Sequence, residues 1–226
     1  MKKHLRKKGF TLVELIVVIA IIGVLAAILV PTMMGFVRDS KITSANKVAN
    51  EMSEALSQTL TKLDADGHGM KPTQTATSII TITVSNASGT PTWTTAVTDT
   101  ANFISNDDVD WTATGTGMTS SDKVVDNVDV PQNLLSLEMM NYFPDLTNGY
   151  LWFAVSGGFV RAAYFNETGA AVPQLEAAFD TEGNLVATTT VDWGEKICTW
   201  DNEHNGITVD GLIVGTSPAL ILGNID

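Results

Sequence analysis

The sequence predicts an α+β fold in which one long N-terminal helix packs on a mainly antiparallel β-sheet. Residues 10–37 contain a single charged residue, and the stretch after them repeats its apolar residues at helical spacing. Strand-like segments separated by turn signals fill the C-terminal half. We therefore expect an apolar helix half at 10–37, an amphipathic half at 38–63, and a β-rich globular domain at 64–226, all preceded by a short basic segment at 1–9.

Composition limits the classes of protein that fit. The chain has 226 residues, of which 44% are hydrophobic and 17% charged, so it is too apolar for a disordered protein and long enough to bury a core. Five of the 13 basic residues lie within the first eight positions. After Phe10, 8 basic residues face 25 acidic ones, a net charge of −17. So acidic a body is a poor candidate for binding nucleic-acid phosphates.

The apolar stretch has the length of a membrane span. Its uncharged run from residue 15 to residue 37 would form a helix about 34 Å long, enough for a hydrocarbon core of roughly 30 Å. The basic cluster before it predicts a cytoplasmic N-terminus and export of the rest. A cleaved secretory signal peptide is the alternative. It is disfavoured because the run exceeds an ordinary signal-peptide core and the helical pattern continues beyond it.

Glu14 is the unusual residue of this stretch. A carboxylate within a bilayer costs roughly 2.5–3.5 kcal/mol at central positions and less near an interface, so it needs a partner. No Lys or Arg follows before Arg38, about 36 Å along a helix. We expect either that the partner comes from outside this helix or that the carboxylate stays near the lipid headgroups. A free α-amine made by cutting before Phe10, on the same or a neighbouring chain, would serve as the partner.

The helix is expected to have two weak points and a defined end. Pro31 has no N–H to bond the carbonyl of residue 27, and Gly23 is the second weak point. Beyond Arg38 an apolar stripe predicts an amphipathic helix that ends near Leu63, before the sequence Asp64-Ala65-Asp66-Gly67. The stripe consists of Met34, Val37, Ile42, Ala45, Val48, Met52, Leu56, Leu60 and Leu63.

The body is expected to contain one short helix and several strands. Leucine spacing before Pro144 predicts a helix at 131–142. Apolar runs on either side of Ser156-Gly157-Gly158 predict a hairpin over 150–165. Alternation and turn signals predict further strands at 78–85, 92–97, 175–179, 185–191, 196–200, 207–209 and 212–214.

The N-terminal residues also carry a family resemblance. Lys7-Lys8-Gly9-Phe10-Thr11-Leu12-Val13-Glu14-Leu15 resembles the processing site of type IV pilins and of the pseudopilins of type II secretion and DNA-uptake machines. The resemblance covers about residues 1–40. It implies that 1–9 is a leader peptide, that a membrane prepilin peptidase cuts between Gly9 and Phe10, and that Phe10 is N-methylated. It also implies that Glu14 assists subunit addition by meeting the Phe10 amine of a neighbouring subunit.

The resemblance further implies a structural subunit, not an enzyme. An assembly ATPase and a membrane platform would extract the subunit from the inner membrane, its N-terminus cytoplasmic, into an extracellular helical filament of itself or other pilins. A pseudopilin is the alternative within the family, and a membrane-tethered adhesin or receptor is a less favoured one. No nucleic-acid partner is expected.

We find no catalytic or cofactor-binding constellation in the sequence. The three histidines are His4, His68 and His204, and Cys198 lies in an apparent strand, where a buried inert thiol is expected. Because Cys198 is the single cysteine, the intrachain disulfide of many pilins is excluded. Calcium is given no site, since the acidic clusters lack ligand spacing; they are Asp64 and Asp66, then Asp107, Asp108 and Asp110, then Asp122, Asp126 and Asp129.

Overall fold

The computed structural model describes residues 11–71, 77–105, 110–113, 115–122, 130–169, 171, 198–201, 206–209 and 212–217. The chain divides into two compact units, residues 1–40 and residues 41–226. Helix α1 (Leu12–Ala65) begins in the first unit and ends in the second. The sequence predicted a helix from Phe10 to about Leu63, and the described helix agrees with it within two residues at each end.

The first unit presents an apolar helix surface. Between Leu12 and Val37 the large apolar side chains of α1 are 45% to 75% exposed. The segment Leu12–Met34 has a mean hydropathy of 3.1 and, by its length and composition, could cross a membrane. Such an exposed apolar surface marks a contact with lipid or with another protein.

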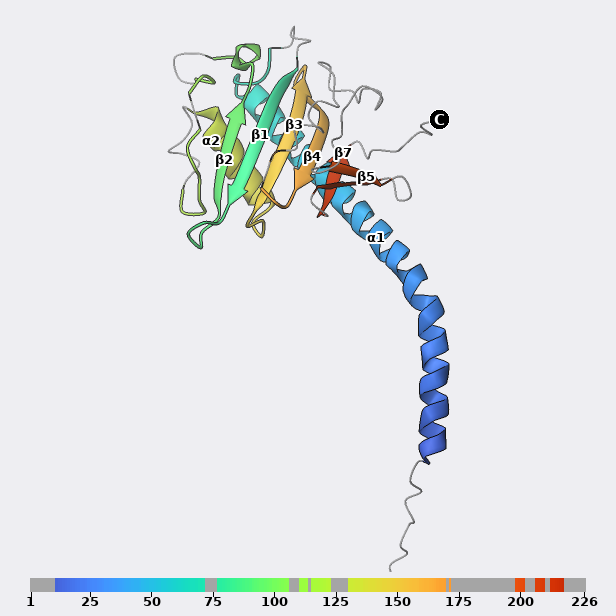
Figure 1. Ribbon diagram of the computed structural model, residues 1–226. Coiled ribbons are helices and arrows are strands. Elements are labelled where there is room, and N and C mark those ends of the chain that lie inside the picture. The colour runs from blue at the N-terminus through green and yellow to red at the C-terminus, as the bar shows by residue number, and fades with distance from the viewer. Residues whose placement is uncertain are drawn as a thin grey trace, which may run out of the picture. The chain divides into compact units, whose positions relative to one another are not determined.

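The second unit contains a seven-stranded sheet in the order β2-β1-β3-β4-β7-β6-β5, and its paired strands are antiparallel (Figure 1). This arrangement confirms the α+β fold class. A short helix α2 and a 3₁₀ turn η1 complete the described elements. Their bounds are β1 (Ser78–Ser85), β2 (Thr92–Val97), η1 (Thr100–Asn102), α2 (Pro131–Tyr142), β3 (Gly149–Ser156), β4 (Phe159–Asn166), β5 (Cys198–Asp201), β6 (Gly206–Val209) and β7 (Leu212–Ser217).

Most of the predicted elements of the body are confirmed. Strands β1 and β2 and helix α2 have the predicted bounds, and the β3–β4 hairpin turns at Gly157 and Gly158. Strand β7 continues to Ser217, beyond the predicted end at residue 214. The strands predicted at 175–179 and 185–191, and the turn between them, lie outside the described residues.

One face of the sheet forms the core with the second half of α1 and with α2. Ile80, Ile82 and Val84 alternate along β1 and are fully buried. They share a cluster with Leu56 of α1 and Met139 of α2, which places both helices on the same face (Figure 1). Burial of each large aliphatic side chain contributes about 1.5–3 kcal/mol. The part of the predicted stripe from Ile42 to Leu63 therefore covers the sheet, whereas Met34 and Val37, in the first unit, are exposed.

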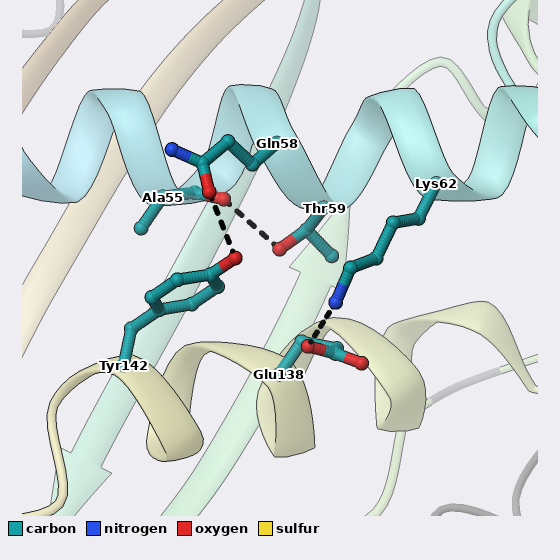
Figure 2. Close-up of polar contacts among 6 residues, drawn as sticks. All are labelled: Ala55, Gln58, Thr59, Lys62, Glu138 and Tyr142. Carbon is teal, nitrogen blue, oxygen red and sulfur yellow. Dashed lines mark hydrogen bonds and ion pairs between the residues drawn. The ribbon is translucent and has the colours of Figure 1, made fainter.

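Polar contacts at the rim join α1 to α2. Lys62 Nζ lies 3.0 Å from Glu138 Oε2, and the Tyr142 hydroxyl donates to Gln58 Oε1 at 3.0 Å (Figure 2). The hydrogen bond to Glu138, and then its charge, raise the pKa of Lys62. The Lys62 side chain is 58% exposed, so solvent screens the pair, and such ion pairs are worth about 1 kcal/mol or less.

A core side chain should therefore contribute more to the free energy of unfolding than the Lys62–Glu138 ion pair does. We expect Leu56→Ala to lower the free energy of unfolding by about 2–5 kcal/mol, because it removes a fully buried side chain and leaves a cavity. Lys62→Met should cost less than about 1 kcal/mol. Urea unfolding of the full chain in detergent, followed by tryptophan fluorescence, measures both values. An equal loss in the two variants would contradict this account of the core.

Strand β7 lies directly against α1. Gly215 approaches the Ala45 carbonyl so closely that a Cβ would collide with the helix backbone. Directly after this contact in both elements, Thr216 N–H donates to Asn46 Oδ1 at 3.0 Å, and the Ser217 hydroxyl bonds Asn50 Oδ1 at 3.1 Å. Two polar residues of the helix thus hold a strand almost at the other end of the chain.

Gly215→Ala tests this close approach. The added methyl group must push β7 away from α1, so we expect the free energy of unfolding to fall by about 1–3 kcal/mol. Ser217→Ala is the matched control in the same strand, and it removes a single hydrogen bond to the exposed Asn50, which should cost about 0.5 kcal/mol. Unchanged stability of the Gly215 variant would show that β7 is not held against the helix.

Candidate functional site

Glu14 and Thr11 form a capping box at the start of α1. Glu14 Oε2 accepts hydrogen bonds from the Thr11 backbone N–H and hydroxyl, each at 2.8 Å. The Thr11 hydroxyl oxygen accepts the Glu14 N–H at 3.3 Å. This reciprocal pattern between the N-cap and the third helical residue satisfies amide groups that have no partner inside the helix. A carboxylate at this position also interacts favourably with the helix dipole.

The capping box gives Glu14 partners that the sequence-based expectation did not include, and the expected cationic partner from outside the helix stays a prediction. A partner for Glu14 was expected from outside the helix, and the structure supplies hydrogen-bond donors from Thr11 in the same turn. The signal was present in the sequence as Thr11-Leu12-Val13-Glu14, a capping-box pattern directly before an apolar run. Both bonds use Oε2, and within the described part of the chain Oε1 has no hydrogen bond.

The remaining N-terminal site residues lie partly outside and partly inside the described helix. Gly9 and Phe10, the residues of the predicted cleavage, lie outside the described residues. Gly23 and Pro31 lie inside α1, which is assigned as one helix through both. An added Cβ at Gly23 would meet nothing within 4 Å, so no contact inside the chain requires a glycine there. Their role as weak points of the helix stays a prediction.

Two carboxylates of the acidic clusters are held in local turns. Asp110 Oδ1 accepts the N–H and the hydroxyl of Thr112, at 2.8 and 2.6 Å. Asp122 Oδ2 accepts the N–H and the hydroxyl of Thr119, at 2.7 and 2.9 Å. Among the described residues no three His, Cys, Asp or Glu side chains gather as a metal site would require. Asp107, Asp108, Asp126 and Asp129 lie outside those residues, and calcium keeps no assigned site.

The described contacts of His68 and Cys198 belong to the packing of the body, not to a catalytic site. The carbonyl of His68 accepts the Trp111 indole N–H at 3.0 Å. Cys198 lies opposite Val209 in the β5–β6 pair. The structure does not describe the burial of its thiol. His4 and His204 lie outside the described residues.

Comparison with known proteins identifies the N-terminal segment. A family described as "Prokaryotic N-terminal methylation motif" matches residues 4–30. The chain is 46% identical over 52 residues to fimbrial protein EcpC of Eikenella corrodens, covering 23% of this chain and 34% of the relative. It is 40% identical over 50 residues to type IV major fimbrial protein FimA of Dichelobacter nodosus, covering 22% of this chain and 32% of the relative.

The likeness is confined to the N-terminal part. The matched segment spans about a third of the length of these curated relatives. No solved structure matches the chain. The methylation motif lies on the apolar first half of α1, and this is the segment that the chain shares with the fimbrial proteins. These findings support assignment of the chain to the type IV pilin family, through its N-terminal segment.

The two threonine–aspartate turns generate a pH prediction. Hydrogen bonds from Thr112 and Thr119 lower the pKa values of Asp110 and Asp122 below their ordinary value of 3.8. A carboxyl group with a lowered pKa in the folded state stabilises the fold above its unfolded pKa, and this contribution disappears as the pH falls through the folded pKa. Both carboxyl groups are solvent-exposed, and solvent screening weakens their contribution to stability. The influence of the hydrogen bonds should therefore be measured on the pKa values themselves.

We expect Thr112→Val to raise the pKa of Asp110 more than Thr119→Val raises that of Asp122. The side-chain hydrogen bond is the main cause at Asp110, whereas the backbone N–H, which valine keeps, is the main cause at Asp122. Carboxyl ¹³C NMR titration between pH 2 and 6 would give both values. Each variant is the control for the other loop, and equal shifts would refute the assignment of causes.

Proposed function

We propose that the chain is a structural subunit of a type IV pilus-like filament that polymerises through α1. In this proposal a prepilin peptidase cuts between Gly9 and Phe10, and Phe10 becomes N-methylated. The observation that carries the proposal is the methylation motif over residues 4–30, placed directly on an exposed apolar helix. The relatives that share this segment are named as fimbrial proteins.

The first half of α1 suits two environments in turn. Before assembly, Leu12–Met34 lies in the cytoplasmic membrane, with the basic N-terminus inside the cell. After extraction by an assembly ATPase and its membrane platform, the same surface packs against α1 of neighbouring copies. Small residues let such helices approach closely, and this stretch contains Ala20, Gly23, Ala26 and Ala27. A head-to-tail contact whose rotation does not close then gives an open fibre at the cell surface.

Glu14 would set the register of this contact. Its Oε2 caps the helix of its own chain, and Oε1 is left to accept the methylated Phe10 ammonium of a neighbour. An ion pair in a low-dielectric environment with good geometry stabilises one alignment and leaves others with an unpaired charge. One carboxylate can therefore serve both the start of the helix and the addition of a subunit.

A membrane-tethered adhesin is the second candidate, and the capping box favours it. The capping box explains the presence of Glu14 at this position by its role in starting the helix, without a second subunit. A pseudopilin, whose short fibre drives secretion or DNA uptake, shares the same N-terminal features as the filament subunit. The tether and the two fibre-forming functions differ in whether the charge of Glu14 is required.

Substitutions at Glu14 and Thr11 separate charge from capping. Glu14→Ala removes both the charge and the acceptor, whereas Glu14→Gln removes the charge and keeps an oxygen that caps the helix. We expect both variants to insert into the membrane at normal levels and to form no fibres. Thr11→Val keeps the carboxylate and the backbone N–H, should cost about 1 kcal/mol of helix stability, and should still form fibres.

Electron microscopy of sheared surface material, with immunoblots of the membrane fraction, provides these readouts. Mass spectrometry of the N-terminus adds a further one, because a methylated Phe10 start supports the filament subunit and an uncleaved Met1 start supports the tether. Normal fibres from Glu14→Gln would assign the residue to capping alone and refute its role in subunit addition.

A further inference from the structure

An exposed aromatic–cation pair lies beside the turn of the β3–β4 hairpin. Phe159 is 65% exposed, and the Arg161 guanidinium carbon lies 5.7 Å from the centre of its ring. Gly157 and Gly158, with φ of 60° and 82°, make the tight turn before it. The Gly158 N–H contacts Met70 Sδ at 3.2 Å, so the turn is anchored to the body. We call Phe159 and Arg161 the hairpin-tip pair.

Unlike Lys47, Lys62 and Lys71, Arg161 contacts an aromatic ring, and like the exposed Lys41 it has no carboxylate partner among the described residues. Lys47 pairs with Glu51 at 3.5 Å and Lys62 with Glu138 at 3.0 Å. Lys71 donates to the Ala101 carbonyl at 2.6 Å. Arg161, in the part of the chain that the structure describes, has its ring contact with Phe159 and no carboxylate partner. In a chain with an excess of 17 acidic residues after Phe10, this cation is available to a second molecule.

The exposure of Phe159 also lacks an explanation inside the chain. Among the described residues from Lys41 onward, the other exposed large hydrophobic side chain is Tyr142, which is 39% exposed and bonds Gln58. Arginine and aromatic side chains are enriched at the energetic centres of protein interfaces. A guanidinium over a ring keeps its N–H edges free, and these edges match a carboxylate with two parallel hydrogen bonds.

We propose that the hairpin-tip pair binds an acidic surface on the body of a second copy of this chain. The proposal rests on the proposed function, because a filament holds copies side by side. Bodies that each carry a large negative charge repel one another, so a contact between them needs a cation at the interface. Phe159 supplies apolar area next to that cation, and an acidic copy of the same chain is the matching partner.

Photo-crosslinking of the full chain in cells tests the contact. Phe159 is replaced by p-benzoylphenylalanine, the cells are irradiated, and crosslinked products are identified by immunoblot and mass spectrometry. We expect dimers and higher oligomers of this chain, joined to peptides rich in Asp and Glu. The same replacement at Tyr142 is the matched control, because it is the other exposed aromatic of the described body, and it should crosslink several-fold less.

Variants at Arg161 test its charge and its shape. Arg161→Glu, placed in the chain with the crosslinker at 159, should lower the yield of crosslinked dimer about tenfold. Arg161→Lys keeps the charge but loses the planar fork, and should give an intermediate yield. Arg161 is exposed, so membrane levels of each variant should equal those of the parent and report intact folding.

The contact and the filament can fail separately. Fibres with equal crosslinking at residues 159 and 142, or with crosslinks from 159 to another protein only, would overturn the contact and leave the filament intact. Dimers crosslinked through residue 159 in cells that form no fibres would support the contact and refute the proposed filament. A dimer yield unaffected by Arg161→Glu would also overturn the contact.

Discussion

The body depends on the apolar stripe along the second half of α1. Strand β1 turns three fully buried aliphatic side chains toward one face of the sheet, and an antiparallel sheet cannot bury such a face by itself. Leu56, Leu60 and Leu63 provide the opposing surface, and α2 covers more of the same face through Leu135 and Met139. The helix is therefore part of the core of the globular domain as well as its connection to the N-terminal segment.

The periodic elements were predictable because their signals are local. The repeat along α1, the leucines of α2 before Pro144 and the glycines after Ser156 each specify a short-range conformation. The strand order was not predictable, since β7 lies between β4 and β6 through pairings between distant residues. The end of β7 was placed too early because Gly215 weakens a strand signal, whereas in the structure it permits the approach to Ala45.

The candidate site shows how a charge-based argument can overlook a local one. The cost of a carboxylate in lipid predicts a cationic partner at a distance, whereas the hydroxyl and amide of Thr11, three positions earlier, bond one oxygen of Glu14 within its own chain. The two explanations are compatible, because one oxygen of Glu14 is used for capping and the other is not. The four residues of the capping box, from Thr11 to Glu14, thus lie within the methylation motif over residues 4–30.

The docking of β7 on α1 has a consequence for the order in which the protein matures. Asn46 and its partner Thr216 are 170 residues apart, so α1 is made long before the strand that binds it. At typical synthesis rates the interval is roughly 10–35 seconds. Until β7 and the rest of the sheet are made, the leucine stripe on the second half of the helix is uncovered and open to chaperones or proteases. Docking of β7 is therefore among the last contacts of the body to form, and a chain truncated before it would lack the contacts at Ala45, Asn46 and Asn50.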